Sequence, residues 1–206
     1  MKREEKNLIS LQKILENATQ EFARQGYGLS SVNTICTAGG ISKGILYHYF
    51  KDKDELYLAC LKNCFDRLTA ALRACEDDVE GGTDECLARY FDVRLAFFEE
   101  NPKLLSLFCE AVISPPAHLK AEVREIKADF DTLNVCILTA LLEKVPLQSG
   151  VTVEEVVEVF RLYQDFINAR YRMENFGPDD WKQREQICRR SLHILLYGVV
   201  EREERA

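Results

Sequence analysis

Apolar residues recur along almost the whole chain at intervals of three and four, the spacing of helices with one buried face. Nowhere does a strict alternation of apolar and polar residues last long enough to predict a strand. The first apolar stripe comprises Leu8, Leu11, Leu15, Ala18 and Phe22. We expect this helix to stop at Gly26, because glycine suits the left-handed cap that ends many helices. The pattern predicts an all-α chain.

Two short helices are expected next. The first should begin after Ser30 or Ser31 as N-cap and end at the glycine pair 39–40. Ser42 can then cap a helix over residues 43–49. Together with the first helix they predict a small three-helix unit, and a boundary between domains 1–51 and 52–206.

A long helix is expected to follow the charged segment 51–55. Turn residues, mostly proline and glycine, separate the later helices. These are expected near 84–100, 103–113, 118–145, 153–176 and 179–203. The second domain is thus also predicted to be helical.

Composition limits the class of protein. With 206 residues, 47% hydrophobic and 30% charged, the chain can bury a sizeable core and is not disordered. No apolar run approaches the roughly 18 residues that span a bilayer, and the first residues lack a signal-peptide pattern. We therefore expect a cytoplasmic protein without a membrane partner.

Eight cysteines raise the alternatives of disulfides or a metal site. Cys60 and Cys64 lie one helical turn apart, but neither a Cys-x-x-Cys pair nor a nearby histidine completes a tetrahedral ligand set. Free, mostly buried thiols are expected, with no metal and no cofactor. Scattered histidines and the lack of a Glu-x-x-His motif or phosphate loop also argue against an enzyme.

A net charge of −7 taken alone argues against nucleic-acid binding, but the charge is unevenly distributed along the chain. Residues 1–56 carry eight Lys or Arg against seven Asp or Glu, so the acidic excess belongs to the remainder. A near-neutral N-terminal domain and an acidic body suit a protein that touches nucleic acid at one end.

The segment from Gly26 to Leu56 carries the most specific pattern. It contains Ala-Gly-Gly-Ile-Ser-Lys-Gly at 38–44, Leu-Tyr-His-Tyr-Phe at 46–50 and Lys-Asp-Glu-Leu at 53–56. This segment resembles the helix-turn-helix signature of TetR-family transcriptional regulators. The resemblance covers about a quarter of the chain by motif. Gly39 departs from it, because relatives usually carry alanine there, and is expected to cost about 0.5–1 kcal/mol if helical.

The resemblance implies which residues contact DNA. The third helix should lie in the major groove, with Ser42 at its phosphate-favouring N-terminus and Gly44 leaving room for close approach. Phosphate contacts are implied for Tyr47, His48 and Lys53, and base-edge contacts for Lys43, Gly44, Ile45 and His48. Ile45 can touch a thymine methyl group. For Ser30, Ser31 and Asn33, DNA contact and simple helix capping both remain open.

Binding by two such heads implies a homodimer on a palindromic operator. In the family the last two helices pair with their twins as a four-helix bundle, although an intramolecular core explains part of their apolar stripes. The predicted interface comprises Val159, Phe166, Leu192, Leu195, Leu196 and Val199.

The middle helices are rich in aromatic residues that can line an apolar effector cavity or form plain core. Candidate pocket residues are Phe97, Phe108, Phe130, Asn134, Tyr163, Gln164, Ile167 and Asn168. The three amides can orient a ligand or satisfy helix ends and each other. Two functions follow: a ligand-responsive repressor with a small hydrophobic effector, or an architectural or partner-binding DNA factor of the same fold without one.

Overall fold

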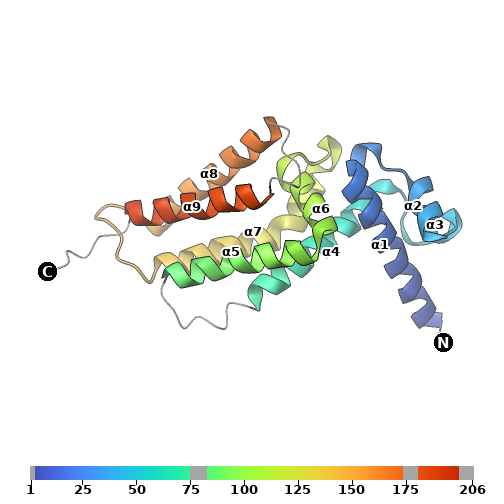
Figure 1. Cartoon of the computed structure of the whole chain (residues 1–206), viewed down its shortest axis with the longest axis horizontal. Helices are drawn as coiled ribbons and strands as arrows, with labels where there is room; N and C mark the ends of the chain where they lie inside the picture. Colours follow the sequence, from blue (N-terminus) through green and yellow to red (C-terminus); the bar gives the residue numbers. More distant parts are fainter. Residues whose placement is uncertain (1–2, 75–82, 174–180, 200–206) are drawn as a thin grey trace. The chain divides into compact units, whose positions relative to one another are not determined.

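The computed structural model describes residues 3–74, 83–173 and 181–199. In these ranges the regular elements are helices: α1 (Arg3–Leu29), α2 (Val32–Gly39), α3 (Lys43–Tyr49), α4 (Lys53–Arg73), α5 (Thr83–Glu100), α6 (Pro102–Ile113), η1 (Ala117–Leu119), α7 (Lys120–Leu142), α8 (Val153–Met173) and α9 (Trp181–Val199) (Figure 1). The all-α prediction is confirmed, because these ranges contain no strand.

The contacts divide the chain into two compact units. Unit 1 contains residues 1–67 and 100–128, and unit 2 contains residues 68–99 and 129–206. The chain passes between them within α4, between α5 and α6, and within α7. The predicted boundary after residue 51 separates a DNA-binding domain from the remainder of the chain, and it stays a prediction.

In unit 1, α1 packs against both α2 and α6. Ile35 of α2, Leu46 of α3 and Tyr57 of α4 are fully buried, and Phe22 of α1 is almost so. The rings of Phe22 and Tyr57 meet edge to face with their centroids 5.1 Å apart. Such a pair contributes about 0.5–1.5 kcal/mol beyond its burial, so α1 and α4 are firmly joined at this point.

The backbone of α1 kinks where the sequence predicts a stop. Gly26 has φ 68° and ψ 171°, a conformation that side-chain-bearing residues rarely adopt, and a further helical turn continues to Leu29. The prediction located the break correctly, but the helix resumes beyond it.

The N-terminal half of α1 is less buried than its apolar stripe suggests. Ala18 and Phe22 are buried, whereas Leu8 is 71% exposed. Leu11 and Leu15 line a groove of about 580 Å³ that α4 and the start of α6 complete. An apolar stripe identifies the inner face of a helix but not how far the neighbouring helices reach along it.

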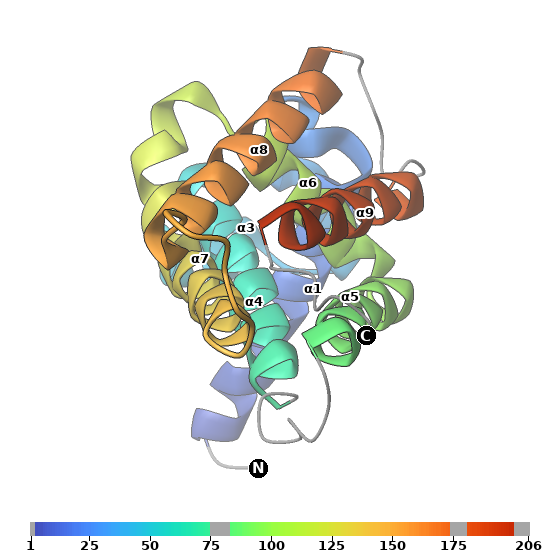
Figure 2. The same ribbon diagram turned by 90° about the vertical axis from the view of Figure 1, so that its left-hand side faces the viewer.

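Unit 2 has its own core, to which α5, α7, α8 and α9 contribute. Phe91, Phe98, Leu138 and Trp181 are buried there. Helices α8 and α9 are packed neighbours, as two perpendicular views show (Figures 1 and 2). Among the residues described, none of the helices is long and apolar enough to cross a membrane.

Seven cysteines fall within the description and all are free thiols. Cys36, Cys60, Cys64 and Cys188 are buried, while Cys136 is exposed. Burial raises the pKa of Cys60 and of Cys64 to about 12. Within the described ranges, no group of three His, Cys, Asp or Glu side chains is arranged to hold a metal ion.

Candidate nucleic-acid interface

Helices α2 and α3 form a capped helix-turn-helix. The Ser31 hydroxyl accepts the Asn33 amide at 3.2 Å and starts α2. Gly40, with φ 56° and ψ 38°, ends α2 and donates its amide to the carbonyls of Cys36 and Thr37. This left-handed cap turns the chain sharply, and only glycine adopts it without strain.

Helix α3 presents one buried and one open face. Ser42 caps it by accepting the Ile45 amide at 3.2 Å, and Leu46 is fully buried. The open face carries the predicted reading residues Ser42, Lys43, Gly44, Ile45, Tyr47 and His48, all of them exposed. The structure thus brings these six together on one short helix and its cap, and their contact with DNA stays a prediction.

Two features leave this face open to a partner. Ile45 is 46% and Tyr47 50% exposed, so two large side chains stand in solvent on a seven-residue helix. A Cβ atom added at Gly44 would meet nothing closer than the Ser42 hydroxyl at 4.0 Å. The backbone there is open to close approach, and Lys43 supplies the positive charge.

Gly39 has a packing role that the sequence did not reveal. It is buried at the last position of α2, and a Cβ atom there would lie 2.6 Å from Ile41 Cδ1 and 3.0 Å from Asn17 Nδ2. The glycine permits close packing of α2 on α1, which offsets its intrinsic cost in a helix.

The three candidates before and within α2 differ in accessibility. Ser30 is buried, and its hydroxyl donates to the Tyr27 carbonyl at 2.8 Å. Ser31 is the N-cap, and its amide also donates to the buried Glu21 carboxylate at 3.3 Å. Asn33 is exposed. Ser31 is a cap and half-buried, and Asn33 is the most exposed of the three, so DNA contact by these two residues stays a prediction.

Lys53 is engaged with its own unit. Its ammonium donates to the carbonyls of Tyr27 at 2.8 Å and Ser30 at 3.3 Å, and lies 4.2 Å from the centre of the Tyr27 ring. It thereby satisfies carbonyls at the end of α1, where a cation is favoured by the helix dipole. A phosphate contact from Lys53 stays a prediction that competes with these bonds.

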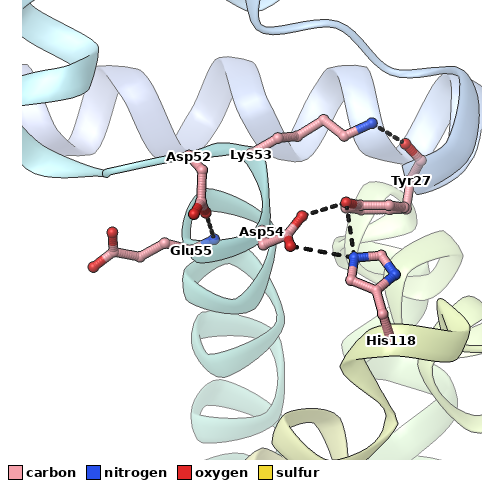
Figure 3. Close-up of polar contacts among 6 residues, drawn as sticks. All are labelled: Tyr27, Asp52, Lys53, Asp54, Glu55 and His118. Atoms are coloured by element: carbon pink, nitrogen blue, oxygen red, sulfur yellow. Dashed lines mark hydrogen bonds and ion pairs between the residues drawn. The ribbon is translucent and has the colours of Figure 1, made fainter.

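Tyr27 is the centre of a network that sequence reasoning missed. Its hydroxyl donates to Asp54 of α4 and lies 3.2 Å from Nε2 of His118, which is also 3.2 Å from Asp54 Oδ2 (Figure 3). Burial and the Asp54 carboxylate raise the Tyr27 pKa to about 12. Its amide donates to Glu110 of α6 at 2.9 Å. Contacts across 83 and 91 residues leave no local signal in a sequence.

Two carboxylates fix the first turn of α4. Asp52 accepts the Glu55 amide at 2.8 Å (Figure 3). The Glu55 carboxylate in turn accepts the Lys51 amide, just before the helix, at 2.7 Å. This satisfies donors that helix formation leaves open. The Lys-Asp-Lys-Asp-Glu segment therefore positions α4 directly after α3.

In unit 2, α8 exposes part of the predicted dimer face. Val159 is 48% and Phe166 62% exposed, and Leu162 between them is 60% exposed. Leu192 is instead buried in its own unit, at 4% exposure. It belongs to the intramolecular core, so its assignment to the interface needs correction. The side chains of Leu195, Leu196 and Val199 lie outside the described residues.

The candidate effector residues do not all fall in one unit. Phe108 belongs to unit 1, where its ring packs 5.5 Å from that of Phe65, and the other seven belong to unit 2. Asn134 accepts the Tyr90 hydroxyl at 2.6 Å, and Asn168 accepts Arg184 at 2.6 Å. These two amides are thus hydrogen-bonded to other side chains of unit 2, and a role in orienting a ligand stays a prediction.

A buried charged cluster lies between α5 and α9. Arg94 pairs with Glu185 at 3.2 Å, and Arg184 lies 3.7 Å from the same carboxylate. Trp181 lies near both guanidinium groups, at 5.5 and 5.2 Å from its ring centre. Burial opposes the charged form of Arg94, but the Glu185 carboxylate outweighs it and raises the Arg94 pKa. The cluster joins α5 to α9 within unit 2.

The capped α2–α3 pair with an exposed second helix defines a helix-turn-helix protein. Residues 14–60 match the family described as bacterial regulatory proteins, tetR family. This N-terminal region is therefore a helix-turn-helix domain of the TetR type.

The relatives share this class. The chain is 27% identical over 125 residues to the HTH-type transcriptional regulator RutR of Escherichia coli strain K12, covering 60% of this chain and 58% of the relative. Over 123 residues it is 25% identical to the negative transcriptional regulator of the icaADBC biofilm operon, IcaR, of Staphylococcus epidermidis, covering 58% and 62%. The chain thus spans about three-fifths of these relatives' length.

The fold likeness extends further along the chain. The transcriptional regulator FadR of Bacillus subtilis, solved in complex with stearoyl-CoA, superposes with a TM-score of 0.62 at 17% identity. The match covers 86% of this chain and 97% of that one. It supports the predicted fold of an N-terminal helix-turn-helix domain followed by a helical domain.

Proposed function

We propose that the protein is a sequence-specific DNA-binding transcriptional regulator that reads the major groove with the outer face of α3. The observation that carries this is the open face of Ser42, Lys43, Gly44, Ile45, Tyr47 and His48, held outward by the buried Leu46. The similarity of the chain to RutR and IcaR, both of them transcriptional regulators, supports this proposal.

The regulator acts as a homodimer on a palindromic operator. One helix of seven residues reads only a half-site, and two heads give the affinity needed for specific binding. The exposed apolar row on α8 offers a surface for the second copy. Repression is the expected outcome, as in the negative regulator IcaR.

A small hydrophobic effector would release the protein from DNA by favouring a different conformation of the dimer. The stearoyl-CoA complex of B. subtilis FadR shows that a protein of this fold can take a long acyl ligand. A DNA-binding factor of the same fold without an effector is the second candidate, because Asn134 and Asn168 already have partners in the fold.

The experiment is selection of bound sequences from random duplexes by the purified chain, followed by titration of the selected duplex. A palindromic product and a large loss of affinity in Tyr47→Ala support the proposal. Lys43→Ala should weaken binding, whereas the exposed Lys62→Ala, whose ammonium pairs with Asp66 on α4 at 2.8 Å, is the matched control. Failure to enrich any duplex, or equal losses in Lys43→Ala and Lys62→Ala, would overturn the proposal.

A further inference from the structure

We propose that Tyr27 is a positioning residue through which α6 and η1 set the orientation of the reading helix. The inference rests on the proposed DNA-binding function, but none of its groups lies on the reading face. All of the residues that carry it belong to unit 1.

Both ends of the helix-turn-helix are fastened at Tyr27. The chain enters α2 through Ser30, whose hydroxyl donates to the Tyr27 carbonyl at 2.8 Å. It leaves α3 and starts α4 at Lys53, whose ammonium donates to the same carbonyl at 2.8 Å and to the Ser30 carbonyl at 3.3 Å. A shift of Tyr27 therefore moves the entry and the exit of α2–α3 together.

The anchor of Tyr27 comes from a distant part of the sequence. Glu110 of α6 accepts the Tyr27 amide at 2.9 Å with one carboxylate oxygen and the Tyr57 hydroxyl at 3.0 Å with the other. The kink at Gly26 makes this possible, because it frees the next amide from the helix ladder. A Cβ atom at Gly26 would lie 3.3 Å from the Glu110 oxygen. The absence of a side chain at Gly26 therefore leaves room for the Glu110 carboxylate at the kink.

His118 of η1 provides the second hold (Figure 3). Because its pKa is raised to about 12, the Tyr27 hydroxyl stays protonated and donates a hydrogen bond to Asp54. The oxygens of Tyr27 and Asp54 that face His118 Nε2 are then both acceptors, at 3.2 Å each. Nε2 must therefore carry a hydrogen, and the ring joins η1 to α1 and α4 at once.

These bonds couple the position of α6 and η1 to the reading face. Movement of the segment 102–119 relative to α1 breaks the hydrogen bond from the Tyr27 amide to the Glu110 carboxylate. A bond to a carboxylate is one of the stronger hydrogen bonds that a backbone amide can make. The cost is avoided only if Tyr27 follows, and Tyr27 carries Ser30 and Lys53 with it. A partner or ligand that displaces this segment would thus change the presentation of α3 without touching it.

A purely structural role makes a different prediction. If the network only stabilised unit 1, its removal would lower the melting temperature and leave the affinity of folded protein for DNA unchanged. A positioning role loosens α2–α3 within a folded unit. DNA affinity and local amide exchange separate the two.

The test compares Tyr27→Phe and Glu110→Ala with two controls in the full chain. Gln20→Ala deletes another tertiary bond between α1 and α6, donated by the Lys103 ammonium at 3.1 Å, without touching Tyr27, and should leave DNA affinity unchanged. Glu110→Gln keeps an acceptor for the Tyr27 amide and should stay close to wild type. For Glu110→Ala we expect about tenfold weaker binding to the selected duplex, the equivalent of one bond to a charged group.

The second readout needs no DNA. Hydrogen exchange of free protein should accelerate at the amides of residues 32–49 in Tyr27→Phe and Glu110→Ala, with residues 153–173 as the internal reference. Accelerated exchange with weakened binding supports the inference. Unchanged exchange at 32–49, or wild-type affinity in both variants, would overturn it. A wild-type chain that selects no duplex would instead refute the proposed function, while the exchange comparison still decides whether Tyr27 positions α2–α3.

Discussion

The ammonium of Lys53 lies 4.2 Å from the centre of the Tyr27 ring while donating to the carbonyl oxygen of the same residue at 2.8 Å. One side chain thereby contacts both the ring and the backbone of its partner. Lys53, which belongs to the predicted DNA-binding motif, thus satisfies backbone carbonyls at the end of α1.

Replacing Lys53 with methionine tests this assignment, because methionine keeps much of the apolar stem but cannot donate. We expect the free energy of unfolding to fall by about 1.5–3 kcal/mol, the range for hydrogen bonds of a charged group. Chemical unfolding followed by circular dichroism measures it.

The salt dependence of DNA binding distinguishes the two roles of Lys53. Each phosphate contact contributes about 0.9 to the slope of log K against log salt on duplex DNA. Lys53→Met should leave the slope unchanged, whereas Lys43→Met should reduce it by about one contact. A reduced slope in Lys53→Met would restore the phosphate contact implied by the family resemblance.

Gly39→Ala should destabilise unit 1 even though alanine is the better helix former. The new Cβ atom would lie 3.0 Å from Asn17 Nδ2, which donates to the Lys13 carbonyl at 2.8 Å and would lose that bond by moving away, and 2.6 Å from the Ile41 Cδ1 methyl group. Overpacking typically costs about 1–3 kcal/mol, against a gain of about 1 kcal/mol in helix propensity. Ile41→Val removes that methyl group. In this background Gly39→Ala should be less harmful, and a thermodynamic cycle of the four proteins measures the difference. Equal costs in both backgrounds would contradict the packing explanation.

The elements near residues 26–56 were predictable because their signals are local. Serine caps, the glycine pair and the buried Leu46 lie within a few residues of the structures they determine. The same reasoning could not find Glu110 or His118, which act on Tyr27 from 83 and 91 residues away. It also placed Leu192 on the interface, because an apolar helical stripe does not say whether its partner is the same chain.

Thiol chemistry should follow burial. Cys60 and Cys64, with pKa values raised to about 12 from 9.0 by burial, should resist iodoacetamide near pH 8, whereas the exposed Cys136 should react. Peptide mass spectrometry after timed labelling identifies the modified residues. Labelling of Cys60 as fast as Cys136 in folded protein would contradict its burial.

The same pKa values predict a loss of stability in alkali. The unfolded chain releases these thiol protons near pH 9, while the folded chain holds them to about pH 12. Between these values the folded state binds more protons, so its stability falls as pH rises, and the contribution is fully present below pH 9. Unfolding midpoints near pH 8 and pH 10.5 should differ less in Cys60→Ala than in wild type.

The buried cluster of unit 2 should be intolerant of losing a single charge. Glu185, at 1% exposure, faces Arg94 at 3.2 Å, so Glu185→Gln leaves a buried guanidinium without its carboxylate. We expect a loss of about 3–5 kcal/mol. Arg94→Met combined with Glu185→Leu should recover only part of it, because the apolar pair needs no compensation but the buried Arg184, 3.7 Å from the same carboxylate, loses that partner. Urea unfolding of the single and double variants tests this, and additive losses would contradict the coupling.

The exposed apolar row of α8 should decide the oligomeric state. Val159, Leu162 and Phe166 are 48%, 60% and 62% exposed and recur at three- and four-residue intervals on one helix face. Phe166→Asp places a charge where the second copy would exclude water, so the variant should sediment as a monomer under conditions in which wild type is a dimer. Its DNA affinity should fall steeply because each head then holds only a half-site. Ile45→Asp is the contrasting variant: it should abolish DNA binding but sediment as wild type does. A dimeric Phe166→Asp protein would show that this row is not the interface.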